Sequence, residues 1–368
     1  MKHSIVFKSK DSYSSFPLLS RTKKGNLLIG FFTAPRPDHF GVFEWKIMVS
    51  PDEGESWGDL ANNVVTQYDY SILSPREKSD TFFTESKNRI VTAGSFGFLF
   101  NPITKEFKQS RLLTHCVYWP SQQKAKQNQY MLPDMKNVLT FPRFLKEGNL
   151  ILIPVYGLVK ESNLSRCMAW RSTDGGLNFN LYNMFPDGVD GNEMAFVKVG
   201  NEILAHIRSD NHPYLMESRS EDFGRTWTYP VMVRAQGEER INKPKKEARF
   251  NPFKNVIGGP PHLLRVSEEN GIGTKILCTY GYRQEKMGIR AIVSNDEGRT
   301  WEGPIILRED GGYSSNLHKK KWFRKEPSPA IDIGYPVSIQ LKDKSILTAY
   351  YITCQDRITG IETTKWRI

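Results

Sequence analysis

Four stretches of the chain repeat one phrase of eight residues. They read Ser50-Pro-Asp-Glu-Gly-Glu-Ser-Trp57, Ser172-Thr-Asp-Gly-Gly-Leu-Asn-Phe179, Ser220-Glu-Asp-Phe-Gly-Arg-Thr-Trp227 and Ser294-Asn-Asp-Glu-Gly-Arg-Thr-Trp301. The common pattern is Ser-x-Asp-x-Gly-x-(Ser/Thr)-Trp, and the second copy ends in Asn-Phe instead. In a tight turn the Asp side chain accepts hydrogen bonds from backbone amides just downstream, and Gly takes the φ > 0 conformation. Such a recurrence predicts a repeat protein.

Six pairs of apolar segments, each joined by a short polar turn, surround these phrases. They cover residues 16–31, 80–96, 141–155, 193–208, 259–281 and 334–351. Six repeats of one four-stranded antiparallel sheet predict an all-β fold, the six-bladed β-propeller, with the repeated phrases in turns of the blades. A solenoid would have shorter and more uniform repeats, and a β-sandwich would not repeat a turn phrase four times.

Two repeats depart from the pattern. The second lacks the phrase and has Asn101–Phe107 at the place where we expect it. The last is short, so we expect His3–Lys8 to supply its outer strand and close the ring. Because propeller blades form one continuous ring, residues 1–368 are predicted to be a single domain.

The composition is that of a globular protein with a basic surface. Hydrophobic residues make up 39% of the chain, enough for a large core, and the formal net charge is +11. Two basic runs, Lys243–Lys246 and His318–Lys325, fall between repeats. They are either solvated loops or an attraction for an anionic ligand such as an acidic glycan. No known nucleic-acid-binding module is visible, so nucleic acid is not an expected partner.

No apolar run is long enough to predict a membrane span, since the longest is Asn149–Val159. The first ten residues lack an apolar stretch of signal-peptide length, so the expected location is the cytoplasm, or a secreted or periplasmic one if a leader has been removed. The four cysteines have no metal-type spacing and are expected to be free thiols: Cys116, Cys167, Cys278 and Cys354. We expect no metal or cofactor, and the oligomeric state stays open.

Topology predicts which end of the blades carries the chemistry. If the strands of a blade are A to D, the phrases lie in the C–D turns, so their aspartates Asp52, Asp174, Asp222 and Asp296 are predicted to be structural. The starts of A strands and the ends of B strands lie at the opposite end, where propellers usually hold ligands. The residues at these places are Ser15, Asp80, Phe141, Glu193, Pro260 and Tyr335 at A-strand starts, and Arg36, Asp38, His39, Arg208 and Arg283 at B-strand ends.

The phrase resembles the Asp-box, or BNR repeat, and the whole chain resembles the sialidase (neuraminidase) superfamily of six-bladed propellers. Asp-boxes also occur in non-enzymatic propellers, so the matches at the other end are more telling. Asn192-Glu193 with Arg208 is similar to the segment with the sialidase glutamate and one carboxylate-binding arginine. Thr279-Tyr-Gly-Tyr-Arg283 is similar to the stretch with another such arginine, and Gly334-Tyr335-Pro336 to the one with the tyrosine nucleophile.

The resemblance implies a mechanism in which the nucleophile is a tyrosine rather than a carboxylate. A sialic acid carries its own carboxylate, which would repel an attacking carboxylate. Tyr335 would therefore attack, Glu193 would accept its proton, and Asp38 would protonate the leaving oxygen and later activate water. Arg208 and Arg283 would bind the substrate carboxylate through paired hydrogen bonds. Three further residues are candidate substrate contacts: Arg36, His39 and Asp80.

One departure concerns the sugar. Sialidases open the first blade with Arg-Ile-Pro, and this chain has Ser15-Phe-Pro17 there, so one carboxylate-binding arginine is missing. Arg21 lies too far along the strand to replace it. Losing one bidentate partner of a buried carboxylate weakens binding strongly. Sialic acid, a uronic acid and a neutral sugar therefore all remain open as the terminal sugar.

Each assignment has a structural alternative. Tyr335 would then only pack on Pro336, Arg283 would only stack on Tyr282, and Glu193 would form a structural ion pair with Arg208. The sequence predicts an exo-glycoside hydrolase that acts on a terminal, acidic sugar. The alternative is a non-catalytic propeller that binds glycans or serves as a scaffold.

Overall fold

The structure is a computed structural model that describes residues 1–368 except 23, 36–43, 61–80, 87–88, 96–97, 102–105, 110–111, 163, 187, 210–211, 213, 237–258, 268–273, 285 and 320–332. The described residues form β-strands and two short 3-10 helices, η2 (Pro120–Gln122) and η3 (Asn316–Lys319), without an α-helix. No helix within these ranges has the length and apolarity to span a membrane. The chain divides into two compact units: unit 1 is Met1–Ile72, Asp210–Leu215 and Met232–Ile368, and unit 2 is Leu73–Ser209 and Met216–Val231.

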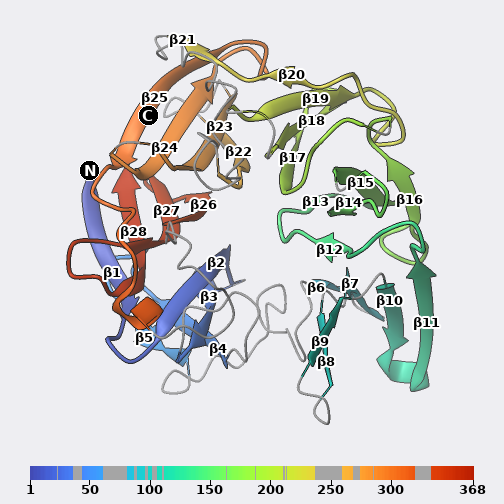
Figure 1. The fold of residues 1–368 in the computed structure, drawn as a ribbon, viewed down its shortest axis with the longest axis horizontal. Coiled ribbons are helices and arrows are strands. Elements are labelled where there is room, and N and C mark those ends of the chain that lie inside the picture. Colours follow the sequence, from blue (N-terminus) through green and yellow to red (C-terminus); the bar gives the residue numbers. More distant parts are fainter. Residues whose placement is uncertain are drawn as a thin grey trace. The chain divides into compact units, whose positions relative to one another are not determined.

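Unit 1 carries three antiparallel sheets, which we number as blades 1, 5 and 6 (Figure 1). Blade 1 has the order β2 (Tyr13–Arg21), β3 (Leu27–Ala34), β4 (Glu44–Ser50) and β5 (Gly58–Asp59). Blade 5 has β22 (His262–Ser267), β23 (Thr274–Tyr282), β24 (Gly288–Ser294) and β25 (Trp301–Arg308), with β21 (Ala235–Gln236) running parallel to β25. Blade 6 has β26 (Ile333–Gln340), β27 (Ile346–Thr353), β28 (Thr359–Trp366) and β1 (Lys2–Lys8).

Unit 2 carries blades 2, 3 and 4. Blade 2 has the order β6 (Thr81–Ser86), β7 (Arg89–Ser95), β10 (Leu112–Trp119) and β11 (Lys124–Met131). In blade 3, β12 (Leu139–Thr140) and β13 (Leu145–Glu147) both pair with β14 (Leu150–Leu158), which is followed by β15 (Ser165–Ser172) and β16 (Asn180–Asn183). Blade 4 has β17 (Met194–Val199), β18 (Glu202–Ile207), β19 (Met216–Ser220) and β20 (Val231–Met232).

The fold is therefore an all-β six-bladed β-propeller, as predicted. Within each blade the strands pair in the order of the chain, but the β8–β9 hairpin interrupts blade 2, β21 lies outside β25 in blade 5, and the outer strand of blade 6 comes from the other end of the sequence. The outer strand of blade 6 is β1, which pairs antiparallel with β28 so that Lys2 faces Lys365 and Lys8 faces Gly360. The expected closure by residues 3–8 is confirmed.

Alternating side chains of the second strand in a blade pack against two neighbouring sheets. In β27 all eight residues are buried. Ile346 and Tyr350 belong to a core that also contains Leu277 of blade 5, whereas Ala349 and Tyr351 belong to one with Phe31 of blade 1. A strand with sheets on both faces is buried at every position, so the alternation of apolar and exposed polar residues that marks an exposed sheet is absent from it.

The repeated phrases form one turn with the same hydrogen bonds in all four copies. In the third copy the Ser220 hydroxyl donates to Asp222 Oδ1 at 2.9 Å and accepts the Gly224 amide at 2.7 Å. The Thr226 amide and hydroxyl donate to the two carboxylate oxygens of Asp222 at 2.9 and 2.7 Å. All four phrases connect the third and fourth strands of a blade, so the expected structural role of their aspartates agrees with the geometry.

Asn101–Phe107 does not occupy the equivalent place in blade 2, contrary to the prediction. Its flanking strands, β8 (Phe98–Asn101) and β9 (Glu106–Gln109), form a separate hairpin inserted between β7 and β10. The turn between the third and fourth strands is instead made by η2, where Gln123 adopts the left-handed conformation. A short hairpin with apolar residues is indistinguishable from a strand–turn–strand of the blade by pattern alone.

Glycine in the phrase is required by conformation and also by packing between blades. Gly54 and Gly224 have φ of 90° and 88°. A Cβ on Gly54 would lie 2.9 Å from Leu347 of blade 6, and a Cβ on Gly224 would lie 2.7 Å from Leu152 of blade 3. These two phrases thus pack on the second strand of the preceding blade, and a larger residue in place of either glycine would force the two sheets apart.

The phrase aspartates make stability depend on pH in the acid range. Burial raises the pKa of Asp222, but hydrogen bonds from Thr226 and Ser220 outweigh it and lower that pKa to about 2; the pKa of Asp296 is lowered to about 2 in the same way. A carboxyl with a depressed folded-state pKa stabilises the fold above its unfolded-state value and loses this contribution as the pH falls through the folded-state value. We expect the free energy of unfolding to fall between about pH 4 and pH 2. Urea titrations across this range check it, and the fall should be smaller in Asp222→Asn; an unchanged slope in that variant would contradict the assignment.

Candidate functional site

The residues of interest lie at the ends of strands opposite the phrases. The structure describes Ser15, Glu193, Arg208, Arg283 and Tyr335 at the predicted strand ends. Arg36, Asp38, His39 and Asp80 lie outside the described residues, and so do Lys243–Lys246 and most of the second basic run. The described candidates fall into two groups of side chains, one within each unit, and each group is described by itself.

Tyr335 sits on an irregularity of β26 and has an unusual backbone conformation. The register of β26 against β27 shifts between Gly334 and Val337, and Tyr335 has a φ of 51°. A left-handed conformation is strained for an aromatic L-residue, and such strain is concentrated at functional sites. The ring is half-buried and contacts Tyr351, with the centroids 5.9 Å apart. Tyr335 is thus held firmly while part of its side chain stays accessible.

Phe16 repeats this conformation in the adjacent blade. The register of β2 shifts between Ser15 and Leu18, Phe16 has a φ of 56°, and proline follows it as Pro336 follows Tyr335. The rings of Phe16 and Tyr335 meet edge to face, with centroids 4.6 Å apart and an interplanar angle of 84°. Tyr335 therefore packs mainly on aromatic rings and not only on Pro336, which was its structural alternative.

Arg283 is buried beside the same segment. It follows β23 and is 4% exposed, and its Nη2 donates to the Ile333 carbonyl at 3.4 Å. The backbones of blades 5 and 6 approach closely here, since a Cβ on Gly281 would lie 3.0 Å from the Gly334 Cα. The guanidinium touches Gly334 for the same reason: a Cβ there would lie 3.4 Å from its Nη2.

The charge of Arg283 is not matched by a carboxylate of the described part of the chain, and its buried Nε has no hydrogen-bond partner there. The structural alternative had Arg283 stacking on the Tyr282 ring. That ring is covered by Arg290 instead, whose guanidinium carbon lies 3.3 Å from the ring centroid. A buried cation without an anionic partner is costly. The structure thus places a guanidinium suited to a carboxylate against Ile333 and Gly334, the two residues that precede Tyr335.

In unit 2, Glu193 and Arg208 form a buried ion pair. Glu193 and Arg208 lie just beyond the paired ends of β17 and β18. The Arg208 amide donates to the Glu193 carbonyl at 2.8 Å, so the antiparallel pairing continues by one residue pair. Arg208 Nη1 lies 2.5 Å from Glu193 Oε2, and the residues are 8% and 5% exposed. This pair is what the structural alternative predicted. It also places a carboxylate at the end of the blade where the resemblance expects one.

Two polar residues of unit 2 near these strand ends were not predicted from the sequence. Asp190 precedes β17, and it accepts the Ser209 hydroxyl at 2.8 Å and the Ser165 amide at 3.1 Å. Arg143 is 6% exposed, and its guanidinium lies 5.5 Å from the Phe141 ring centroid. A signal for Arg143 was present: Phe141 is followed by proline, as Phe16 and Tyr335 are, so an aromatic-Pro pair marks three first strands.

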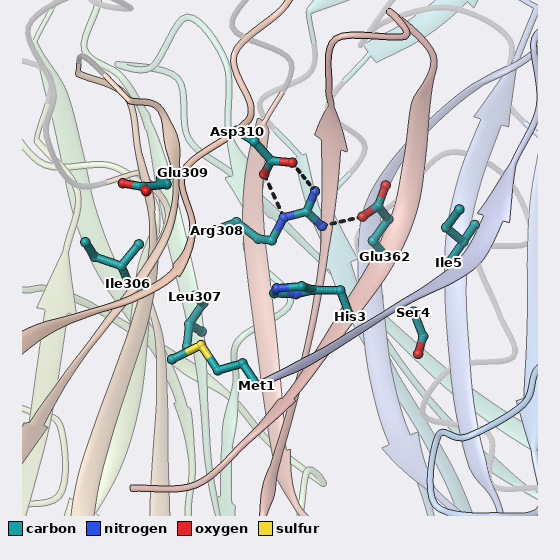
Figure 2. A pocket seen from close by; sticks show the side chains of 10 residues that line it. All are labelled: Met1, His3, Ser4, Ile5, Ile306, Leu307, Arg308, Glu309, Asp310 and Glu362. Carbon is teal, nitrogen blue, oxygen red and sulfur yellow. Dashed lines mark hydrogen bonds and ion pairs between the residues drawn. The ribbon is translucent and has the colours of Figure 1, made fainter.

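A cavity of about 470 Å³ lies elsewhere, at the outer edge of blades 5 and 6. Figure 2 shows Arg308 at its centre, between Asp310 and Glu362. The Arg308 guanidinium holds the pKa of Asp310 below its usual value, and burial together with Arg308 lowers the pKa of His3. Because two carboxylates already match the charge of Arg308, this cavity is less suited to an anionic ligand than the surroundings of Arg283.

Metal-ligating residues are not clustered in the part of the chain that the structure describes, where no group of three His, Cys, Asp or Glu could hold an ion. The four cysteines are free thiols. Burial raises the pKa of Cys354 to about 11, so this thiol is protonated at neutral pH. The chemistry available at the described strand ends is therefore that of tyrosine, carboxylate and guanidinium groups.

Comparison with known proteins places the fold among glycosidase propellers. No protein-family model matches the chain. A sialidase of Clostridium perfringens is 26% identical over 109 residues, which are 29% of this chain and 27% of that sialidase. The match thus spans about a quarter of the relative's length.

Solved structures align over nearly the whole chain. A protein of unknown function from Dyadobacter fermentans has a TM-score of 0.69 at 19% identity and covers 100% of this chain and 98% of its own. A Hadza microbial sialidase has a TM-score of 0.57 at 13% identity, covering 97% and 66%. The α-L-arabinofuranosidase of Fusarium graminearum has a TM-score of 0.58 at 10% identity, covering 99% and 98%. This chain has the six-bladed fold of these proteins.

Proposed function

We propose that this chain is a glycoside hydrolase of sialidase-like fold that removes a terminal acidic sugar from a glycan. The observation that carries the proposal is the buried guanidinium of Arg283, which lies against the Ile333-Gly334 segment that precedes Tyr335 and has no carboxylate partner in the described ranges. A substrate carboxylate would supply the missing negative charge. The sugars named for the sialidase and arabinofuranosidase relatives differ, so the fold by itself leaves the sugar open.

The proposed reaction retains the anomeric configuration. The Tyr335 hydroxyl oxygen attacks the anomeric carbon, its proton passes to Glu193, and the bond to the leaving oxygen breaks as Asp38 protonates that oxygen. Water, deprotonated by Asp38, then displaces the tyrosyl oxygen, which takes its proton back from Glu193 as the sugar is released. A neutral phenol suits this step because a carboxylate nucleophile would be repelled by the carboxylate of the sugar. Arg208 and Arg283 are the proposed carboxylate ligands, and Arg36, His39 and Asp80 the proposed further contacts.

Ser15 occupies the position at which sialidases have a third carboxylate-binding arginine. It is fully buried, and its hydroxyl has no hydrogen-bond partner within the described residues. Fewer arginines mean weaker binding of the carboxylate, so the terminal sugar is either a sialic acid bound less tightly or another acidic sugar such as a uronic acid.

A panel of chromogenic glycosides tests the function, with sialosides, uronides and α-L-arabinofuranosides as probes. We expect release of an acidic sugar, and Arg283→Met should lower kcat/KM for it about tenfold to a hundredfold because a charge-assisted pair is lost. Hydrolysis of a neutral glycoside, where it occurs, should not change in this variant. Activity confined to neutral sugars would overturn the acidic substrate.

The second candidate is a glycan-binding propeller without catalysis. It is favoured by the ion pair of Glu193 with Arg208, because a carboxylate held by a guanidinium is a weaker base. This candidate would be supported over the hydrolase if no glycoside of the panel is hydrolysed and an acidic glycan binds with an affinity that Arg283→Met weakens.

A further inference from the structure

Four half-buried aromatic rings follow one another from Tyr335 across the end of blade 1. Centroid distances are 4.6 Å from Tyr335 to Phe16, 6.4 Å from Phe16 to Phe32, and 4.8 Å from Phe32 to Trp45. We call these four residues the aromatic strip. They come from β26, β2, β3 and β4, which lie in unit 1.

Strand register places the rings at one end of the blade. Ser15 of β2 faces Phe32 of β3, and Phe32 faces Trp45 of β4. These are the starts of β2 and β4 and the end of β3, opposite the turn that holds the repeated phrase of blade 1. The strip therefore begins at the proposed nucleophile and leads outward across three strands of the neighbouring blade.

The backbone at Phe16 indicates that this arrangement is more than ordinary core packing. Phe16 and Tyr335 both adopt a left-handed conformation at a shift in strand register. A buried apolar position can be filled by a strand residue with ordinary φ, so strain at two touching aromatic residues points to a functional demand on where the rings lie. The position of the Phe16 ring is therefore under the same functional constraint as that of the Tyr335 ring.

Half-buried aromatic rings suit carbohydrate because they offer an apolar face next to polar groups. Sugars have apolar C–H faces and polar edges, and a ligand site typically combines aromatic side chains with a few placed polar groups. The four neighbouring rings together form a surface longer than a single terminal sugar ring. Arg283, at the Tyr335 end, supplies the charge that the terminal sugar needs.

We propose that the aromatic strip binds the sugars on the leaving-group side of the scissile bond, so that the substrate is an acidic oligosaccharide chain. This inference rests on the proposed hydrolase function for its assignment of the terminal sugar to Tyr335. Phe16, Phe32 and Trp45 are then specificity-determining residues, and Trp45 contacts the sugar furthest from the bond that breaks.

The test compares a short and a long substrate with the same terminal sugar. The probes are methylumbelliferyl glycosides of a sialic acid and a uronic acid, and two acidic pentasaccharides that end in these sugars. Trp45→Ala should lower kcat/KM on the pentasaccharide about tenfold and leave the methylumbelliferyl glycoside within about twofold. Trp45→Phe, which keeps a ring, should restore most of the activity on the pentasaccharide. An equal loss of kcat/KM on both substrates, or no loss on either, would overturn the proposal that the strip binds sugars.

A binding measurement separates this proposal from the proposed function. Calorimetric titration of Tyr335→Phe with the two pentasaccharides should show binding that the added Trp45→Ala substitution weakens about tenfold. If no glycoside is hydrolysed but binding still depends on Trp45, the hydrolase function is refuted and sugar binding by the strip is supported. If Tyr335-dependent hydrolysis is found without any effect of Trp45, the strip is refuted and the hydrolase stands. Absence of both hydrolysis and binding refutes both.

Discussion

Tyr335→Phe is expected to lower kcat by about a thousandfold or more on the acidic glycoside that the enzyme hydrolyses. The substitution removes the attacking oxygen and nothing else. The phenyl ring keeps its contacts with Phe16 and Tyr351, at 4.6 and 5.9 Å between centroids, so the melting temperature should not change. Steady-state kinetics and thermal unfolding of the same preparation measure both quantities.

Tyr351→Phe is the matched control for this variant. It removes the same atom from the neighbouring ring, which is fully buried and belongs to the core between blades 1 and 6. We expect kcat to remain close to that of the wild type. Wild-type turnover in Tyr335→Phe would exclude the tyrosyl intermediate, whereas equal losses in the two variants would assign the effect to packing of the aromatic rings.

Arg208→Met is expected to reduce the free energy of unfolding by about 3 to 5 kcal/mol, because it removes the cationic partner of a buried carboxylate. Glu193 is 5% exposed, and water cannot readily replace the guanidinium that lies 2.5 Å from it. Methionine fills most of the space of the arginine stem, so the loss reports mainly on the charge. Urea denaturation of the two proteins gives the difference.

The double variant Glu193→Gln with Arg208→Met completes a double-mutant cycle. A neutral amide tolerates burial better than an unpaired carboxylate, so the double variant should be more stable than Arg208→Met alone. A loss below about 1 kcal/mol in the single variant would show that the pair behaves like one at the surface. The structural alternative for these residues predicts the stability effect alone; the hydrolase predicts that Glu193→Gln also lowers kcat.

The fold could be predicted from the sequence because its turns have a specific chemistry. Ser220, Asp222 and Gly224 each make a contact that another residue type cannot replace, and this requirement repeats in four turns. Where the turn chemistry is absent, the prediction failed. Blade 2 closes through η2 rather than through Asn101–Phe107, and apolar periodicity did not distinguish the inserted hairpin from a blade strand.

The candidate site could be predicted only to the level of strand ends. Topology placed Arg283 and Tyr335 at those ends, but side-chain direction decides which groups meet. Arg290 lies over Tyr282, and Arg283 turns instead to the Ile333 carbonyl, since a close approach of two backbones at Gly281 brings that carbonyl within reach. The left-handed conformations of Phe16 and Tyr335 follow from shifts in strand register, which local sequence does not encode in an obvious way.

The pairing of β1 with β28 has a mechanical consequence. The strands are antiparallel, and Lys2 at the start of one faces Lys365 near the end of the other. Tension applied at these two points pulls the strands apart from one edge, so hydrogen bonds of the pair break in succession rather than all together. Blade 6 is therefore the place where a stretched molecule opens first, at low force, while sheets formed by consecutive strands stay intact until the load reaches them.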